Sequence, residues 1–127
     1  MELQDLRKYF SVKDSFGGGR GVLKAVDGIS FSIEDNSIFG LVGESGCGKS
    51  TVARLVLRLV HPTSGKIFFR GTDIQELRGD DLMSFRKAVQ IVFQDPFASL
   101  NPRMTVFDAL SEPFRIHRGL KEARLQQ

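Results

Sequence analysis

Hydrophobic and polar residues alternate over the first part of the chain. Leu3–Phe10 predicts a first strand and Val22–Ile33 a second, in which Ile29, Phe31 and Ile33 alternate with polar residues. A period of two with one polar face indicates antiparallel strands that leave one face to solvent. The segment between them, Ser15–Gly21, is rich in glycine but lacks the G-x-G-x-x-G spacing of a dinucleotide site. It is therefore interpreted as a hairpin loop.

Apolar runs of another kind follow the alternating region. Ile38–Val42 is a short unbroken run, typical of a strand buried on both faces, and Val89–Phe93 is interpreted as a second such strand. Lys49–Val60 has apolar residues at helical spacing, and His61-Pro62 is expected to end that helix. The remaining predicted elements are a turn over Glu34–Ser37, a strand over Gly65–Arg70, a short helix over Asp80–Lys87 and a helix from Val106 to Leu110 that Pro113 interrupts.

Composition places the chain among folded soluble domains. Its 127 residues fit one compact domain, and 41% hydrophobic with 26% charged residues is near the globular average. The net charge of +3 comes from basic residues interleaved with acidic ones, which favours a solvated surface over a nucleic-acid patch. A membrane-spanning helix needs about 18 consecutive apolar residues, and this sequence has no such run. The single cysteine excludes an internal disulfide framework and a cysteine zinc cluster, so we expect a cytoplasmic protein.

The segment from Gly43 to Ser50 carries the clearest chemistry, because it matches G-x-x-x-x-G-K-[ST] without adjustment. The glycines let successive backbone N–H groups turn toward a phosphate, and the helix that follows directs its positive end at the same anion. Lys49 would reach the β- and γ-phosphates, and the Ser50 hydroxyl is suited to Mg²⁺. The candidate phosphate-binding residues are Gly43, Glu44, Ser45, Gly46, Cys47, Gly48, Lys49, Ser50 and Thr51.

Phosphate loops occur in GTPases, kinases, helicases and transporter ATPases, so this loop does not name the function. However, Gly43–Thr51 resembles the phosphate loop of ABC ATPases, and the strand ending Gly28–Ile33 precedes it as in that family. Ile91–Val106 resembles the Q-loop region of the peptide and nickel importer branch of the same family. This second segment is the more specific of the two.

The resemblance implies roles for the matching positions. Lys49 and Gln94 would be catalytic, with Gln94 as the Q-loop glutamine that touches Mg²⁺ and the attacking water. Ser50 and Gln94 would be the residues that contact Mg²⁺. Phe10 occupies the position of the aromatic residue that stacks on adenine, and Tyr9 is the neighbouring candidate.

Some positions depart from the family pattern. The turn before the first buried strand usually contains glycine, whereas this sequence has Asn36-Ser37; Asn tolerates a positive φ, so the turn is expected to persist. These 127 residues contain no L-S-G-G-Q signature and no apolar run leading into Asp-Glu, which would supply the Mg²⁺-binding aspartate and the catalytic glutamate. His61 and His117 are not expected to be the switch histidine, which follows that aspartate. We therefore expect this stretch to bind ATP without turnover.

The resemblance implies an α/β fold, a partial P-loop NTPase (RecA-like) core with an N-terminal antiparallel β subdomain and the start of an α-helical subdomain. All 127 residues would be the N-terminal part of one ABC ATPase domain. Residues 1–37 would form the antiparallel β part, 38–94 the phosphate-loop core, and 95–127 the Q-loop and the start of the helical subdomain.

The implied function is the ATP-binding subunit of an ABC importer for peptides or a related small solute, with ATP and Mg²⁺ as its ligands. Its partners would be transmembrane permease subunits and a second ABC ATPase subunit, without nucleic acid. The chain would reach the inner face of the cell membrane only through the permease. The alternatives left open are a soluble ABC ATPase that acts on nucleic acid or ribosomes, and a nucleotide-binding chain without catalysis.

Overall fold

The structure, a computed structural model, describes residues 1–13, 20–95 and 101–118. The chain divides into two compact units, Met1–Leu82 and Met83–Gln127, and each is described by itself. Within the described ranges, none of the helices combines the length and apolarity that a membrane span requires.

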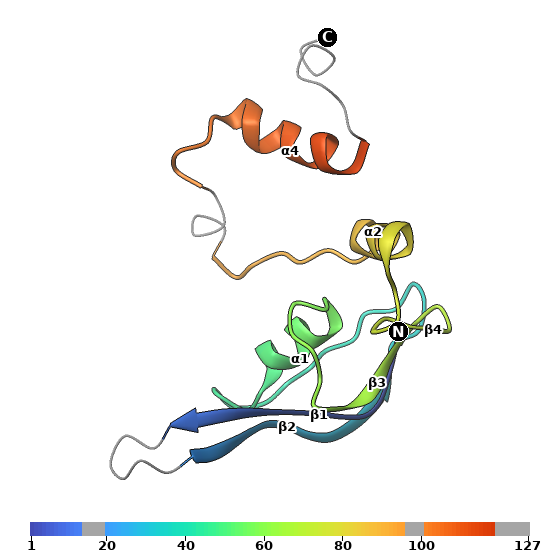
Figure 1. The fold of residues 1–127 in the computed structure, drawn as a ribbon, viewed down its shortest axis with the longest axis vertical. Coiled ribbons are helices and arrows are strands. Elements are labelled where there is room, and N and C mark those ends of the chain that lie inside the picture. Colours follow the sequence, from blue (N-terminus) through green and yellow to red (C-terminus); the bar gives the residue numbers. More distant parts are fainter. Residues whose placement is uncertain (14–19, 96–100, 119–127) are drawn as a thin grey trace. The chain divides into compact units, whose positions relative to one another are not determined.

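The first unit is built on a four-stranded antiparallel sheet in the order β2-β1-β3-β4 (Figure 1). Its strands are β1 (Glu2–Lys13), β2 (Arg20–Ser32), β3 (Ser64–Phe69) and β4 (Thr72–Asp73). The predicted strands at Leu3–Phe10, Val22–Ile33 and Gly65–Arg70 are therefore confirmed. Of the predicted loop Ser15–Gly21, residues 15–19 lie outside the described residues, and residues 20 and 21 belong to β2.

The short strand β4 was not predicted. It pairs with β3 through a two-residue connection, Arg70-Gly71, with Phe69 opposite Thr72. Both connecting residues have positive φ, 51° and 82°, as a type I′ hairpin turn requires. Arginine is an uncommon first residue for such a turn, which is why the sequence carried no clear signal for it.

The pairing of β1 with β2 is irregular at points that matter for the site. Lys8 pairs with Val26 and Tyr9 with Lys24, so Ala25 is an extra residue in β2. Gly28 is extra in the same way, and its φ of 77° suits glycine. Such bulges bend a strand and redirect its backbone groups.

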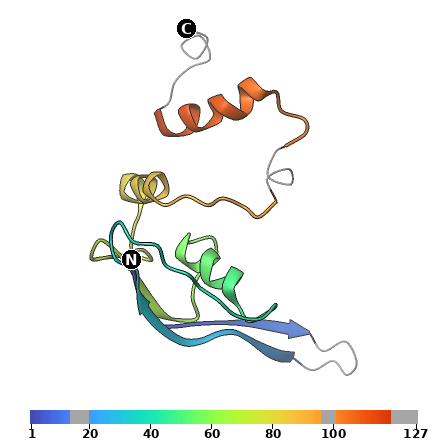
Figure 2. The same cartoon turned by 180° about the vertical axis from the view of Figure 1, so that it is seen from behind.

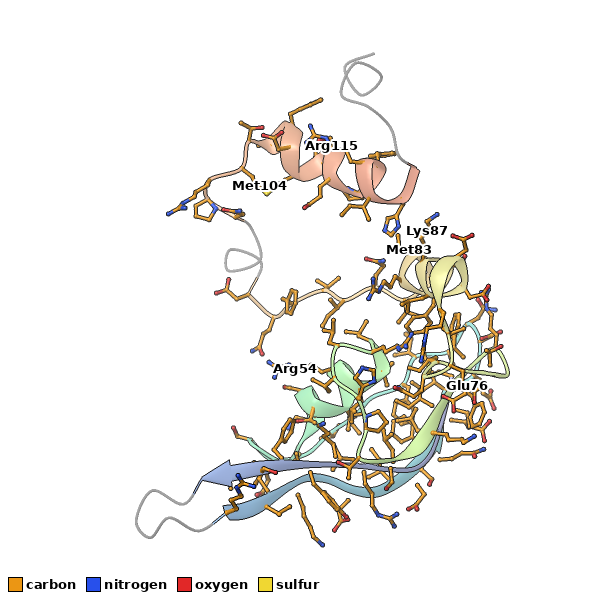
Figure 3. The ribbon with its side chains drawn as sticks, viewed as in Figure 1. Arg54, Glu76, Met83, Lys87, Met104 and Arg115 are labelled. Carbon is orange, nitrogen blue, oxygen red and sulfur yellow. The ribbon has the colours of Figure 1, made fainter. Side chains whose placement is uncertain are left out.

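Helix α1 (Lys49–Val56) lies over one face of the β1–β2 pair in both views of the molecule (Figures 1 and 2). Val52 and Leu55 are buried, because the helical spacing of its apolar residues turns them to the same side. The buried core of this unit consists of these two residues with Leu3, Leu6, Val26, Ile67 and Ile74. Figure 3 shows that Arg54 projects from the same helix, where it is exposed.

The prediction that α1 continues to Val60 was wrong. Arg58, at φ 54°, donates its N–H to Leu55, and the N–H of Leu59 reaches back to Arg54. This pair of bonds is a Schellman ending, in which a left-handed residue closes the last turn. The Arg58 guanidinium then donates to the carbonyls of Leu77 and Gln75, at 2.9 and 3.2 Å. The helix therefore ends before His61-Pro62 is reached.

The turn before the phosphate loop forms as expected. Asn36 has a φ of 57°, and the Ser37 hydroxyl donates to the Glu34 carbonyl at 2.7 Å. The predicted strand Ile38–Val42, in contrast, is extended backbone without strand pairing, and Ile38 and Val42 are almost fully exposed. A strand buried on both faces needs hydrogen-bonded neighbours, and no strand among the described residues pairs with this segment. Within this segment, the Phe39 ring stacks on the Phe31 ring, with the ring centroids 4.8 Å apart.

In the second unit the predicted strand Val89–Phe93 was also wrong, for the same reason. No described strand pairs with it, and Ile91, Val92 and Phe93 are exposed. The predicted short helix is confirmed as α2 (Gly79–Ala88), which crosses the boundary between the units.

Helix α4 (Val106–Arg118) continues through Pro113, contrary to prediction. Thr105 caps its start, because the Thr105 hydroxyl accepts the Asp108 N–H at 3.1 Å and donates to the Asp108 carboxylate at 2.6 Å. Arg115, which projects from α4 in Figure 3, pairs with Asp108 at 3.6 Å and so bridges the turns around the proline.

Candidate nucleotide-binding site

The phosphate loop joins the extended segment after the Asn36 turn to the start of α1. Gly46 and Gly48 have φ values of 81° and 96°, so each backbone turns in a way that side chains resist. Gly48 is the N-cap of α1 and makes no side-chain capping bond, while its carbonyl accepts the Val52 N–H at 2.9 Å. A helix start without a side-chain cap is the arrangement that an anion site needs.

Gly48 also seats the loop on the sheet. A Cβ added there would lie 2.2 Å from the carbonyl oxygen of Ala25, the extra residue of β2. No side chain fits in that space, so the close approach of loop and strand depends on glycine. At Gly43 a Cβ would lie 2.6 Å from Cys47 Sγ, whereas nothing lies within 4 Å of one at Gly46.

Lys49 is positioned by the loop itself. Its Nζ donates to the carbonyls of Gly43 and Glu44, both at 2.6 Å, and lies 3.5 Å from Cys47 Sγ. The ammonium is thus held across the loop, next to the positive end of α1. This arrangement concentrates positive charge where the sequence predicted phosphate.

A cavity of about 250 Å³ connects the loop to the hairpin. The hairpin contributes Phe10, Leu23, Lys24 and Ala25, and the loop and α1 contribute Gly46, Gly48, Lys49, Ser50 and Thr51. The predicted base-binding residue and the central phosphate-binding residues therefore line one cavity. The sequence analysis did not assign the cavity residues that β2 contributes. The signal that identifies them is the pairing of Phe10 with Leu23 across the hairpin.

Tyr9, the other candidate for the base, is engaged elsewhere. Its hydroxyl donates to the Asp27 carboxylate, and the Lys24 ammonium lies 5.4 Å from the centre of its ring. The hydrogen bond to Asp27 raises the pKa of Tyr9, and the bonds from Tyr9 and then Lys24 lower the pKa of Asp27. Phe10, which is 37% exposed, is the aromatic residue left open to a ligand in the cavity.

Gln94, the predicted Q-loop residue, is exposed in a part of the second unit without helix or strand. Residues 96–100, which belong to the segment that resembles the Q-loop region, lie outside the described residues. In the part of the chain that the structure describes, no group of three or more histidine, cysteine or carboxylate side chains could hold a metal ion. The Ser50 hydroxyl group lies on a residue that lines the cavity beside Lys49.

Comparison with known proteins identifies relatives that cover nearly all of this chain. A family model described as ABC transporter matches residues 26–127. The chain is 51% identical over 119 residues to the oligopeptide transport ATP-binding protein AppF of Bacillus subtilis, covering 92% of this chain and 36% of that protein. It is 42% identical over 120 residues to the oligopeptide transport ATP-binding protein OppF of Salmonella typhimurium, covering 92% and 36%. It thus spans about a third of the length of these curated relatives.

Among solved structures, the chain resembles the dimeric ATP-binding cassette MJ0796 in a post-hydrolysis state bound to ADP and Pi. The match has a TM-score of 0.74 at 22% identity and covers 98% of this chain and 52% of that one. At this identity the likeness establishes the fold, and it confirms the predicted α/β fold class. The relatives confirm the resemblance found in Gly43–Thr51 and Ile91–Val106.

Proposed function

This chain belongs to the ABC transporter family, and on that premise we propose that it binds ATP as the nucleotide-binding part of an importer subunit. The observation that carries the proposal is the cavity that Phe10 shares with Lys49, Ser50 and the loop glycines. It offers an open aromatic face at one end and N–H groups with a cation at the other. Base, ribose and phosphates of a nucleotide require these features in this order.

On phosphate binding, Lys49 would exchange hydrogen-bond acceptors. Its ammonium now donates to the Gly43 and Glu44 carbonyls, and it would turn part of that hydrogen bonding to the β- and γ-phosphate oxygens. The N–H groups at the start of α1 would contact the same oxygens, because no side chain caps them. Phe10 would stack on the adenine ring.

The Ser50 hydroxyl beside Lys49 suits a magnesium ion. Mg²⁺ keeps several waters and takes substrate phosphates, so one or two protein oxygens complete its coordination. The Ser50 hydroxyl would be one of these, and the family resemblance implies Gln94 as a second. When bound, the ion neutralises part of the phosphate charge.

The whole protein, of which this chain would be a part, is proposed to hydrolyse ATP and to couple hydrolysis to peptide import. Lys49 would stabilise the charge on the transferring γ-phosphoryl group, and Gln94 would orient the attacking water. Its partners would be permease subunits in the membrane and a second ATPase subunit, which places it at the cytoplasmic face. The 127-residue chain itself is proposed to bind ATP without turnover.

Calorimetry of Mg·ATP binding tests the proposal. We expect the chain to bind ATP, Lys49→Ala to weaken binding of both ATP and tripolyphosphate, and Phe10→Ala to weaken ATP binding alone. Lys66→Ala is the matched control, because Lys66 lies near the Phe68 ring and Asp73 instead of the cavity. Unchanged ATP binding in the Lys49 variant would contradict the proposed site. Lys49-dependent hydrolysis by the 127-residue chain would contradict the claim that it lacks turnover.

A further inference from the structure

Lys8 lies against the ring that the proposed function assigns to the base. Its Nζ is 4.9 Å from the centre of the Phe10 ring, within the range of a cation–π contact. The two residues are separated by one position on β1, and side chains at this spacing share a face of a strand. Lys8 is half-buried.

The surroundings of Lys8 differ from those of other lysines beside aromatic rings. Lys24 pairs with Asp27 at 3.3 Å, and Lys66 pairs with Asp73 at 3.7 Å. The ion pairs among residues 1–13, 20–95 and 101–118 do not include Lys8. Among the described residues no carboxylate pairs with Lys8, and its charge lies against the Phe10 ring.

We propose that Lys8 is a further affinity-determining residue of the nucleobase subsite, where its ammonium holds Phe10 from one side while the other side stacks on the purine. This inference rests on the proposed function, because it concerns the same cavity. An aromatic ring presents negative charge on both faces, and two stacked rings repel each other through those faces. A cation on the outer face counteracts this repulsion and restricts the ring to one orientation before the base arrives.

The expected effect is small and specific. A cation–π contact at an exposed site corresponds to about a two- to five-fold change in affinity. Lys8→Met removes the charge and keeps an unbranched apolar chain, so it should weaken Mg·ATP binding by that factor. Lys8→Arg keeps a cation over the ring and should restore it. Binding of tripolyphosphate, which has no base, should be unchanged in both variants.

A double-mutant cycle makes the test decisive. In a Phe10→Leu background, Lys8→Met should have no further effect on ATP binding, because the ring it acts through is gone. Lys66→Met is the control for loss of a lysine charge near a ring outside the cavity. Circular dichroism checks that each variant folds.

Other outcomes would overturn the inference. Equal losses of ATP and tripolyphosphate affinity would mean that Lys8 acts only through its general charge. Tighter ATP binding by Lys8→Met would mean that the ammonium covers the face that the base needs. An unchanged ATP affinity of Lys8→Met would also refute the inference. That result would leave the proposed roles of Phe10 and Lys49 intact. A wild-type chain that binds no ATP would refute the proposed function together with this inference.

Discussion

Alanine substitutions at Gly46 and Gly48 separate two reasons why the phosphate loop needs glycine. Both residues have positive φ, so either alanine carries a backbone strain of about 1–3 kcal/mol. Only at Gly48 does the added Cβ meet backbone, with the Ala25 carbonyl oxygen 2.2 Å away, whereas the space around Gly46 is open. Forcing a methyl group into a packed position adds about 1–3 kcal/mol.

We therefore expect Gly48→Ala to lower the free energy of unfolding by about 2–6 kcal/mol, and Gly46→Ala by about 1–3 kcal/mol. The assay is urea unfolding followed by circular dichroism, since the chain has no tryptophan and a single tyrosine. Equal slopes against urea concentration would show that both variants unfold from equally compact states. Equal losses of stability in the two variants would refute the explanation that position 48 needs glycine because the loop lies so close to β2.

Three further predictions concern the thiol, the second unit and the end of α1. Mg·ATP should protect Cys47 from a thiol reagent, because its sulfur lies 3.5 Å from Lys49 Nζ; equal labelling rates with and without nucleotide would contradict this. Hydrogen bonds from Thr105, the largest cause, lower the pKa of Asp108, so its stabilisation of α4 is present above about pH 4 and is lost as the pH falls through the lowered pKa. Nuclear magnetic resonance of α4 amides in wild type and Asp108→Asn checks this, and the same acid transition in both would refute it. Arg58→Ala should destabilise the chain by about 1 kcal/mol more than Arg58→Gly, because glycine relieves the positive φ although both variants lose the guanidinium bonds; urea unfolding that ranks them the other way would refute this.

The conformation of the phosphate loop was more predictable from the sequence than the strands around it. The requirement for glycine, a cation and a hydroxyl at fixed spacing is local, so Gly43–Thr51 can be proposed as a phosphate loop without knowledge of the rest of the molecule. The apolar runs Ile38–Val42 and Val89–Phe93 indicated burial, but a strand also needs neighbours to hydrogen bond with. That information is not in the run itself, and both predictions of a strand were wrong.

Two errors came from rules that consider single residues. No glycine marks the end of α1, because Arg58 adopts the left-handed conformation and its guanidinium binds carbonyls remote in sequence. Pro113 lies inside α4, which Thr105 caps at its start and which the Asp108–Arg115 pair spans. At the end of α1 the deciding partners lie far along the chain from the residue that the rule considers.

Ala25, one of the two extra residues in β2, has a consequence for which nucleotides would fit. Phe10 is fixed by its pairing with Leu23, and the start of α1 is fixed by Gly48 against Ala25, two positions along the same strand. The length of β2 between Leu23 and Ala25 therefore sets the distance between the base end and the phosphate end of the cavity. Each residue of strand advances about 3.3 Å. Deleting Ala25 would shorten this distance by one residue, and a nucleotide that fits the original distance would then contact only one end of the cavity.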